Sequence, residues 1–153
     1  MIQEGKKAPD FELASSEGGE VSLTGLKGKT VVLYFYPKDD TPGCTREACA
    51  FRDNQAALKR KGVVVLGVSG DSLASHDKFK AKYKLNFPLL SDPDKAVAKK
   101  YGAWGEKVLY GKKSIGMIRS TFVIDGDGVV RKVFPRVKVD GHAEKVLEAV
   151  SAL

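Results

Sequence analysis

Residues 30–44 read TVVLYFYPKDDTPGC, and much of the architecture follows from how this stretch must fold. The run over 30–36 is apolar nearly throughout, which predicts a buried strand. A short polar turn comes next, and Thr41 then suits the N-cap of a helix whose first residue is Pro42. The stretch therefore predicts a strand, a turn and a helix that carries Cys44 near its third position.

The position of Cys44 predicts a reactive thiol. Backbone N–H groups in the first turn of a helix lack partners, and the positive end of the helix dipole favours thiolate over thiol. The only other cysteine, Cys49, follows five residues later. Two cysteines in 153 residues do not make a disulfide framework, so a catalytic or redox use is expected.

Strand-like and helix-like patterns alternate along the whole chain, which predicts an α/β protein. The length of 153 residues fits a single domain that spans 1–153. Predicted strands are a small hairpin at 11–13 and 20–22, buried strands at 30–36 and 63–68, a short edge-like strand at 88–90, and a hairpin at 120–124 and 129–134. Predicted helices cover 42–61, 75–84, 95–101 and 141–153, and residues 102–116 are expected to form a surface loop or crossover.

The residues around the polar turn match a known pattern. Pro37, Thr41 and Cys44 fit the Pro-x-x-x-Thr-x-x-Cys active-site motif of the peroxiredoxins. The runs FPLLSD at 87–92 and GMIRSTFVID at 116–125 are similar to the bacterioferritin-comigratory, or Q-type, subfamily. This resemblance covers nearly the whole chain. It implies the thioredoxin fold, with an N-terminal hairpin and a central mixed β-sheet flanked by helices.

The resemblance also implies an activity, namely a thiol peroxidase that reduces hydrogen peroxide and organic hydroperoxides without a cofactor or metal. Cys44 is then the attacking sulfur and becomes a sulfenic acid. Thr41 is expected to accept the backbone N–H of Cys44 while its hydroxyl proton points at the peroxide or the sulfur. Pro37 is expected to shield the sulfur from bulk water. Thioredoxin or a related dithiol is the implied reductant.

Two charged residues are candidates for supporting the sulfur. Arg119 stands at the start of a predicted core strand, which is an expensive place for an arginine unless its charge meets a partner. An exposed edge arginine is the alternative from position alone. The resemblance assigns Arg119 to the family's active-site arginine, which holds the thiolate and polarises the peroxide. Glu47 resembles the residue that orients this arginine, although any helix also favours a glutamate in its first turns.

Cys49 matches the resolving thiol of the resembled subfamily, which implies a disulfide with Cys44. Residues five apart on an intact helix have Cα atoms roughly 8.6 Å apart, whereas a disulfide needs less than about 7 Å. We therefore expect the helix to unwind locally around 44–49 on oxidation and to re-form on reduction. An inert, buried cysteine is the alternative for Cys49.

The net charge of +7, from 26 Lys and Arg against 19 Asp and Glu, does not by itself predict a nucleic-acid partner. The basic clusters, such as Lys59-Arg60-Lys61 and Lys112-Lys113, fall at predicted helix ends or loops, and no nucleic-acid motif accompanies them. The chain has no leader-like apolar start and no run long enough to span a membrane, so a soluble, cytoplasmic protein is expected. The chain stops at Leu153, directly after its last predicted helix, which favours a monomer.

Other apparent motifs fail on their context. His76 and His142 lie near predicted helix starts without paired ligand spacing, so they are expected to face solvent and not to bind a metal. The run Asp125-Gly126-Asp127-Gly128 lacks the closing Glu of a calcium loop and predicts a hairpin turn. The alternatives to a peroxidase are a disulfide oxidoreductase on the same fold, a redox sensor that does not turn over, and a basic binding protein.

Overall fold

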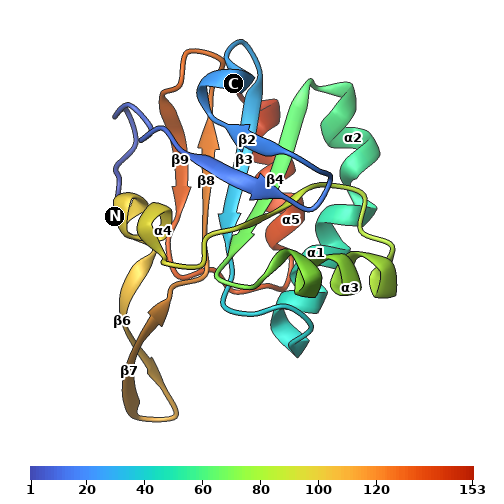
Figure 1. The fold of residues 1–153 in the computed structure, drawn as a ribbon. Coiled ribbons are helices and arrows are strands. Elements are labelled where there is room, and N and C mark those ends of the chain that lie inside the picture. The colour runs from blue at the N-terminus through green and yellow to red at the C-terminus, as the bar shows by residue number, and fades with distance from the viewer.

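Seven strands form one mixed sheet in the order β2-β1-β5-β4-β3-β8-β9 (Figure 1). They are β1 (Glu12–Ser15), β2 (Glu20–Ser22), β3 (Thr30–Phe35), β4 (Val63–Ser69), β5 (Leu89–Ser91), β8 (Ser120–Ile124) and β9 (Val130–Phe134). The central strand β3 runs parallel to β4 and antiparallel to β8. The computed structural model describes residues 1–153, the side chain of Leu109 excepted.

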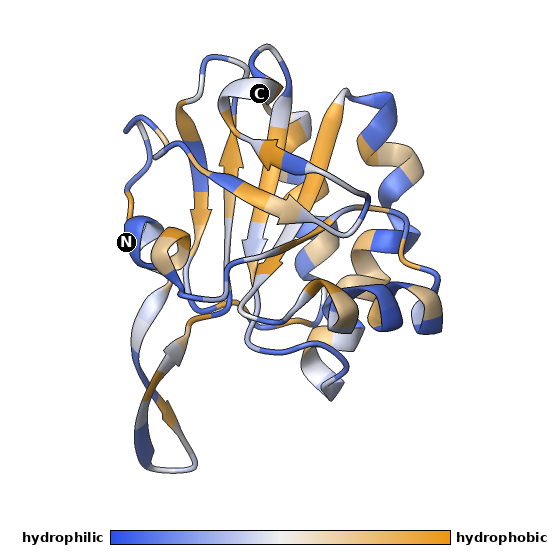
Figure 2. Cartoon of the chain, viewed as in Figure 1, coloured by the Kyte–Doolittle hydropathy of each residue, from blue (hydrophilic) through white to orange (hydrophobic). Residues whose placement is uncertain are grey.

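The apolar run that predicts β3 is buried because the strand has a core on each face. Val31, Leu33 and Phe35 belong to one hydrophobic cluster, whereas Val32 and Tyr34 belong to the other. A strand covered on both faces has no solvent side, so it shows no polar alternation. Figure 2 shows hydrophobic colour along β4 and along the first part of β3, with a paler end of β3.

Helices cover both faces of the sheet (Figure 1). One cluster packs beneath α1 (Pro42–Asp53), α2 (Gln55–Arg60), α3 (Leu73–Tyr83) and α5 (His142–Ser151), and the other beneath α4 (Ala96–Tyr101). A short 3-10 turn, η1 (Thr24–Leu26), precedes β3. The expected N-terminal hairpin is present as β1 and β2, and the Asp125-Gly126-Asp127-Gly128 turn joins β8 to β9. None of the described helices has the length and hydrophobicity needed to cross a membrane.

The single helix predicted over 42–61 is wrong, because the helix is interrupted at Asn54. The Asn54 side-chain amide donates to the carbonyl of Ala50 at 2.8 Å, and its backbone has φ −98° and ψ 2°. Asn86 in turn donates to the carbonyl of Arg52 at 3.3 Å. The chain therefore restarts as α2 without losing the apolar stripe.

Two other boundaries differ from the prediction. Helix α3 is capped by Ser72, whose Oγ accepts the backbone N–H of Ser75 at 3.2 Å, so the helix begins at Leu73, two residues before the predicted start at 75. Strand β5 is not an edge strand, since it lies between β1 and β4 and all three of its residues are buried.

The predicted loop over 102–116 is also wrong, because it contains the hairpin of β6 (Trp104–Leu109) and β7 (Lys112–Met117). Tyr110 and Gly111 both have positive φ, at 52° and 78°, as a tight two-residue hairpin turn requires. The hairpin stands away from the main sheet (Figure 1). Its base lies next to the loop that follows β3, as the lining of a shared hollow shows.

Candidate active site

The end of β3 and the start of α1 place Cys44 as predicted. Helix α1 begins at Pro42, so Cys44 is its third residue, and it is only 2% exposed. Its backbone N–H is among those at a helix start that have no partner within the helix. The sulfur is therefore held at the positive end of α1, beyond the end of the central strand β3.

Arg119 contacts the sulfur directly. It lies between β7 and β8, and its Nη2 donates to Cys44 Sγ at 3.4 Å. Its Nη1 donates to Glu47 Oε1 at 2.8 Å, and the side chain is 18% exposed. A Cβ atom on Gly43 would lie only 3.1 Å from Nη2, so glycine at this position leaves room for the guanidinium. The alternative of an exposed edge arginine is thus wrong.

Glu47 is buried beneath this arginine and is 1% exposed. Its Oε1 accepts from Arg119, but its Oε2 has no hydrogen-bond partner among the described residues. Burial raises the pKa of Glu47 to about 7, although Arg119 acts in the opposite direction. Burial acts to lower the pKa of Arg119, but Glu47 and Cys44 raise it overall. The site therefore keeps one fixed positive charge beside the sulfur.

Thr41 does not make the predicted capping bond. It occupies the N-cap position with φ −101° and ψ 155°, but its side chain makes no cap hydrogen bond. Its Oγ1 instead donates to the backbone carbonyl of Lys38 at 2.8 Å. The hydroxyl proton is thus engaged within the preceding loop and does not point at the sulfur. The predicted hydrogen bond from the Cys44 N–H to Thr41 is therefore wrong.

A hollow of about 380 Å³ opens beside Arg119. Pro37 forms part of its wall, next to the candidate site, and the β6–β7 hairpin contributes Lys107 and Val108. The remaining lining residues are Met117, Ile118, Arg119 and Arg136. Four of these seven lining residues are apolar and three are cationic. This hollow was not foreseen from the sequence, because the hairpin that builds one side was predicted as a loop.

Cys49 lies in the same helix, is partly exposed, and is free like Cys44. The intact helix α1 holds the two cysteines five residues apart, a separation at which a disulfide does not form. The structure thus shows the reduced arrangement of the pair. Any disulfide between Cys44 and Cys49 requires a different backbone conformation in this segment.

Both histidines are buried, which corrects the expectation that they face solvent. His76 is 0% exposed and contacts Asp39, while His142 is 3% exposed. The His142 Nε2 lies 2.8 Å from Thr121 Oγ1. Its ring packs edge-on against Phe51 of α1, with ring centres 6.0 Å apart. His142 therefore links the start of α5 to the helix that carries both cysteines.

His142 gives a testable pH dependence of stability. Burial, together with the charges of Lys145 and Arg119, lowers its pKa from 6.5 to about 4. Between these values the unfolded chain binds a proton that the folded chain does not, so stability falls as the pH falls from 6.5 to 4. The expected total loss is about 3 kcal/mol. It is measured as the difference in unfolding free energy between wild type and His142→Gln across this range, and a flat difference contradicts it.

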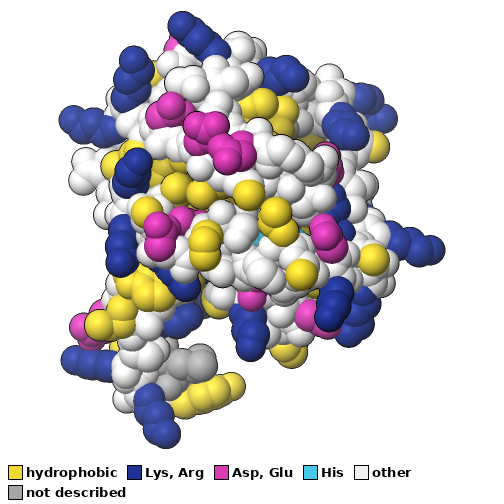
Figure 3. All heavy atoms as spheres, in the orientation of Figure 1, with side chains coloured by type: hydrophobic (Ala, Val, Ile, Leu, Met, Phe, Trp, Pro, Cys, Tyr) yellow, Lys and Arg dark blue, Asp and Glu magenta, His cyan; other side chains and the backbone are white. Residues whose placement is uncertain are grey.

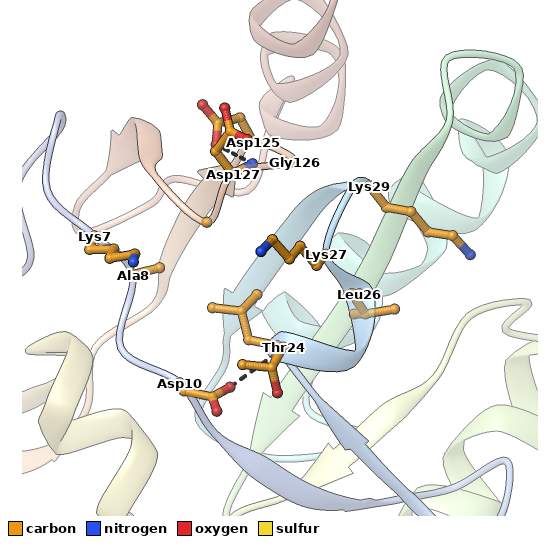
Figure 4. Close-up of a pocket in the computed structure, with 12 residues that line it drawn as sticks. Lys7, Ala8, Asp10, Thr24, Leu26, Lys27, Lys29, Asp125, Gly126 and Asp127 are labelled. Atoms are coloured by element: carbon orange, nitrogen blue, oxygen red, sulfur yellow. Dashed lines mark hydrogen bonds between the residues drawn. The ribbon is translucent and has the colours of Figure 1, made fainter.

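A second hollow, of about 400 Å³, lies at the other end of β3 (Figure 4). Its labelled side chains include Lys7, Asp10, Lys27 and Asp127, from the N-terminal segment, the region of η1 and the β8–β9 turn. Six residues of strand separate it from the cysteine site, which is about 20 Å. It therefore does not belong to the candidate site.

On the face shown in Figure 3, lysine and arginine side chains are spread over the surface and alternate with acidic ones. They do not gather into one basic patch on that face. This distribution agrees with the solvated surface expected from the sequence. The absence of a nucleic-acid partner stays a prediction.

Comparisons with known proteins agree with this geometry. The sequence model of the AhpC/TSA family matches residues 4–133. A putative peroxiredoxin bcp of Coxiella burnetii is 56% identical over 95% of this chain and 97% of its own length. Peroxiredoxin Bcp of Bacillus subtilis is 46% identical over 97% of this chain and 95% of its own length.

Solved structures extend the likeness to the fold. The bacterioferritin comigratory protein of Xanthomonas campestris has a TM-score of 0.88 at 42% identity, covering 93% of this chain and 90% of that one. A cysteine-to-serine mutant of Xylella fastidiosa PrxQ has a TM-score of 0.92 at 36% identity, and the match covers 99% of this chain and 97% of that one. The predicted thioredoxin fold is confirmed. The chain therefore belongs to the AhpC/TSA family and, within it, to the Q-type peroxiredoxins.

Proposed function

We propose that this protein is a thiol-dependent peroxidase that reduces hydrogen peroxide and organic hydroperoxides through Cys44. The observation that carries the proposal is the 3.4 Å contact between Arg119 Nη2 and Cys44 Sγ at the start of α1. A fixed guanidinium and unpaired backbone N–H groups stabilise negative charge on the sulfur and on the oxygen that departs. Glu47 holds the guanidinium in place through Oε1.

The first step joins sulfur to oxygen. The Cys44 thiolate attacks the terminal oxygen of the peroxide, the O–O bond breaks, and the leaving alkoxide or hydroxide takes a proton from solvent to become an alcohol or water. Cys44 is left as a sulfenic acid, oxidised by two electrons. The Arg119 N–H groups lie beside the sulfur, where the departing oxygen gains its charge. Pro37, on the wall of the adjoining hollow, restricts access of water to this region.

The second step uses Cys49. Its thiolate attacks the sulfur of the sulfenic acid, a disulfide forms, and hydroxide leaves and is protonated to water. A dithiol reductant, thioredoxin or a related protein, then returns two electrons and restores both thiols. Because the intact helix keeps the two residues apart, the first turns of α1 unwind during this step.

The hollow beside Arg119 supports the reduction of organic hydroperoxides. Val108, Met117 and Ile118 offer it apolar surface, onto which the carbon portion of such a substrate fits. The related Xanthomonas campestris protein is described as having alkyl peroxide reduction activity. We extend that activity to this chain on the basis of the hollow and the Arg119 contact.

The test of this function is stopped-flow oxidation of the reduced protein by one equivalent of hydrogen peroxide. Fluorescence of the single Trp104 follows the reaction, and mass spectrometry identifies the product. We expect rapid loss of both thiols to an intramolecular disulfide. Oxidation no faster than that of a free thiol would reject catalysis and favour the sensor or binding alternatives.

Replacing Cys49 with serine separates the two steps. Cys49→Ser is expected to keep the first attack at near wild-type rate, because residue 49 does not contact the sulfur of Cys44. The sulfenic acid then accumulates, since the resolving thiol is missing, and reduction linked to a dithiol protein is lost. Trapping with a sulfenic-acid reagent measures the accumulation. Full dithiol-linked turnover in this variant means that the resolving thiol comes from elsewhere.

Four further features are part of the same proposal. Residues 1–153 act as a single domain, in which the Lys7–Val129 bridge and the β1–β5 pairing connect the N-terminal segment to the rest. The protein works as a monomer in the cytoplasm. Reduction of peroxide needs no cofactor or metal, since the two cysteines carry the electrons.

A further inference from the structure

The loop at 36–41, which leads from β3 into α1, is tied to α3 by buried polar groups that the chemistry above does not use. Asp39 Oδ2 accepts from His76 Nδ1 at 2.7 Å and from Ser75 Oγ at 2.8 Å. Asp39 Oδ1 accepts from the Tyr36 hydroxyl at 2.6 Å. Asp39 is 7% exposed and His76 is 0% exposed. Buried polar groups are stable only where their hydrogen bonds are satisfied by partners within the protein.

His76 is bonded on both sides of its ring. Its Nε2 lies 2.9 Å from the carbonyl oxygen of Leu90, and its Nδ1 lies 2.7 Å from the Asp39 carboxylate. A neutral imidazole has one N–H and cannot donate to both acceptors, so the geometry indicates an imidazolium. Burial acts to lower the pKa of His76, but Asp39 and the Leu90 carbonyl raise it overall. Asp39 and His76 therefore form a buried ion pair.

The backbone of the loop is fixed by a neighbouring carboxylate. Asp71 follows β4, and its Oδ2 accepts the backbone N–H of Asp39 at 2.8 Å and the Ser69 hydroxyl at 2.6 Å. Asp39, Asp71 and His76 each place one oxygen or nitrogen within 4.8 Å of those of the other two. Asp39 Oδ1 and Oδ2, Asp71 Oδ2 and both ring nitrogens of His76 have hydrogen-bond partners within the protein, so these atoms hold the loop in place without a metal ion.

Asp40, the next residue of the loop, forms hydrogen bonds with the C-terminal end of α3. Asp40 Oδ1 accepts from the Tyr83 hydroxyl at 2.6 Å, and Asp40 Oδ2 accepts from Lys82 Nζ at 2.8 Å. The backbone of Asp40 has a φ of 56°, a left-handed conformation that persists only where the surroundings hold it. Two consecutive residues of the loop thus depend on α3 for their conformation.

This loop continues directly into the turn of α1 that carries Cys44. In the proposed mechanism that turn is folded when the sulfur attacks peroxide and is unwound when the disulfide forms. A contact made only in the folded arrangement favours that arrangement by its own free energy. Contacts between the loop and α3 are therefore placed to set the balance between the two forms.

We propose that His76 is a positioning residue that latches the 36–41 loop to α3 through Asp39, and so holds the first turn of α1 in the form that reacts with peroxide. This inference rests on the proposed peroxidase function. Loss of the latch shifts the protein toward the unwound form. Oxidation of Cys44 then becomes slower, whereas closure of the Cys44–Cys49 disulfide becomes faster.

Two amide variants test the hydrogen bonds of the two ring nitrogens of His76 separately. His76→Asn keeps a donor near Nδ1 for Asp39, and His76→Gln keeps a donor near Nε2 for Leu90 but loses the bond to Asp39. For His76→Gln we expect oxidation by hydrogen peroxide to slow about tenfold and disulfide closure to accelerate several-fold. For His76→Asn both rates are expected to stay within about twofold of wild type. If the substitution only damages the fold, oxidation of Cys44 and closure of the disulfide are both expected to become slower.

Amide hydrogen exchange of residues 36–49 in the reduced proteins provides a readout that does not depend on catalysis. Exchange is expected to rise in His76→Gln and to stay near wild type in His76→Asn. Two outcomes contradict the proposal. In one, the two variants have equal rates and equal amide exchange; in the other, His76→Gln slows both oxidation and disulfide closure. If wild type itself oxidises no faster than a free thiol, the proposed function fails, and the exchange comparison still decides the latch.

Ser75→Ala provides a milder variant in case His76→Gln does not fold. It removes only the bond from Ser75 Oγ to Asp39 Oδ2 and leaves the His76 contacts in place. As in His76→Gln, we expect slower oxidation of Cys44 and faster closure of the disulfide, but both changes are expected to be smaller. Unchanged rates and unchanged exchange in Ser75→Ala, together with an unfolded His76→Gln, contradict the proposal.

Discussion

Replacing Arg119 with alanine is expected to slow the oxidation of Cys44 by peroxide by about 100- to 1,000-fold, which is typical for loss of one preorganised donor to a developing charge. The Arg119 guanidinium is the only side chain among the described residues that donates a hydrogen bond to the Cys44 sulfur. Its removal leaves the thiolate and the departing oxygen without a fixed positive charge. Stopped-flow oxidation at one equivalent of peroxide measures the loss.

The matched control is Arg131→Ala. Arg131 lies in β9, pairs with Asp125 at 3.2 Å, and is half exposed, so its removal is expected to leave the oxidation rate unchanged. Thermal unfolding of both variants shows whether the fold is retained. Near-normal turnover of Arg119→Ala would assign that arginine a structural role only.

A double variant separates charge from packing. Arg119→Ala leaves Glu47 buried without its partner, and an unpaired buried charge is strongly destabilising unless the group takes a proton. Loss of Arg119 raises the pKa of Glu47 further above about 7, so the unpaired charge is present only at higher pH, where adding Glu47→Gln removes it. The double variant is expected to recover stability but not the rate, because the missing donor to the sulfur is not restored. Recovery of both contradicts a direct role for Arg119.

The parts of the site that follow from local sequence were predictable. A run of seven nearly apolar residues before a proline is a strong strand signal, and Thr41-Pro42 is a strong helix start, so the position of Cys44 is fixed by its neighbours in the chain. The contact with Arg119 lies 75 residues away in sequence. It was reached only through the resemblance to a family, because position alone favoured an exposed arginine.

The hydrogen bond of Thr41 was not predictable in the same way. A threonine hydroxyl at an N-cap has several acceptors and donors within reach, and the conformation of the loop decides among them. Here the carbonyl of Lys38 is the partner. That loop conformation depends in turn on Asp39 and Asp40, whose partners lie on α3 and after β4.

The burial of the two histidines did leave a signal in the sequence. His76 stands three residues before Phe79 and seven before Tyr83, and His142 stands four residues before Val146 and eight before Val150. Both histidines therefore share the apolar stripe of their helix. Their polarity led to the wrong expectation of solvent exposure, although the spacing indicated the core. The β6–β7 hairpin left a weaker signal, the two-residue turn at Tyr110-Gly111.

Oxidation is expected to remove amide protection from residues 42–48 of α1 while α5 stays protected. The disulfide requires Cα atoms closer than about 7 Å, and the intact helix holds the two cysteines at roughly 8.6 Å. Phe51 limits how far the unwinding extends, because its ring stacks on Tyr34 with centres 4.8 Å apart and is fully buried. The helix therefore opens from its N-terminal end, where Glu47 leaves its buried position, and remains anchored at Phe51.

Hydrogen exchange of the reduced and disulfide forms measures this change peptide by peptide. In the disulfide form residues 42–48 are expected to exchange at rates close to those of an unfolded segment, whereas residues 142–151 keep the protection of the reduced protein. Cys49→Ser treated with peroxide is the matched control, since it carries oxygen on Cys44 but forms no disulfide with residue 49. Its α1 is expected to stay protected. If this control loses protection, oxidation of the sulfur unwinds the helix and disulfide closure does not. If the disulfide form keeps its protection, the two cysteines meet without unwinding of the helix.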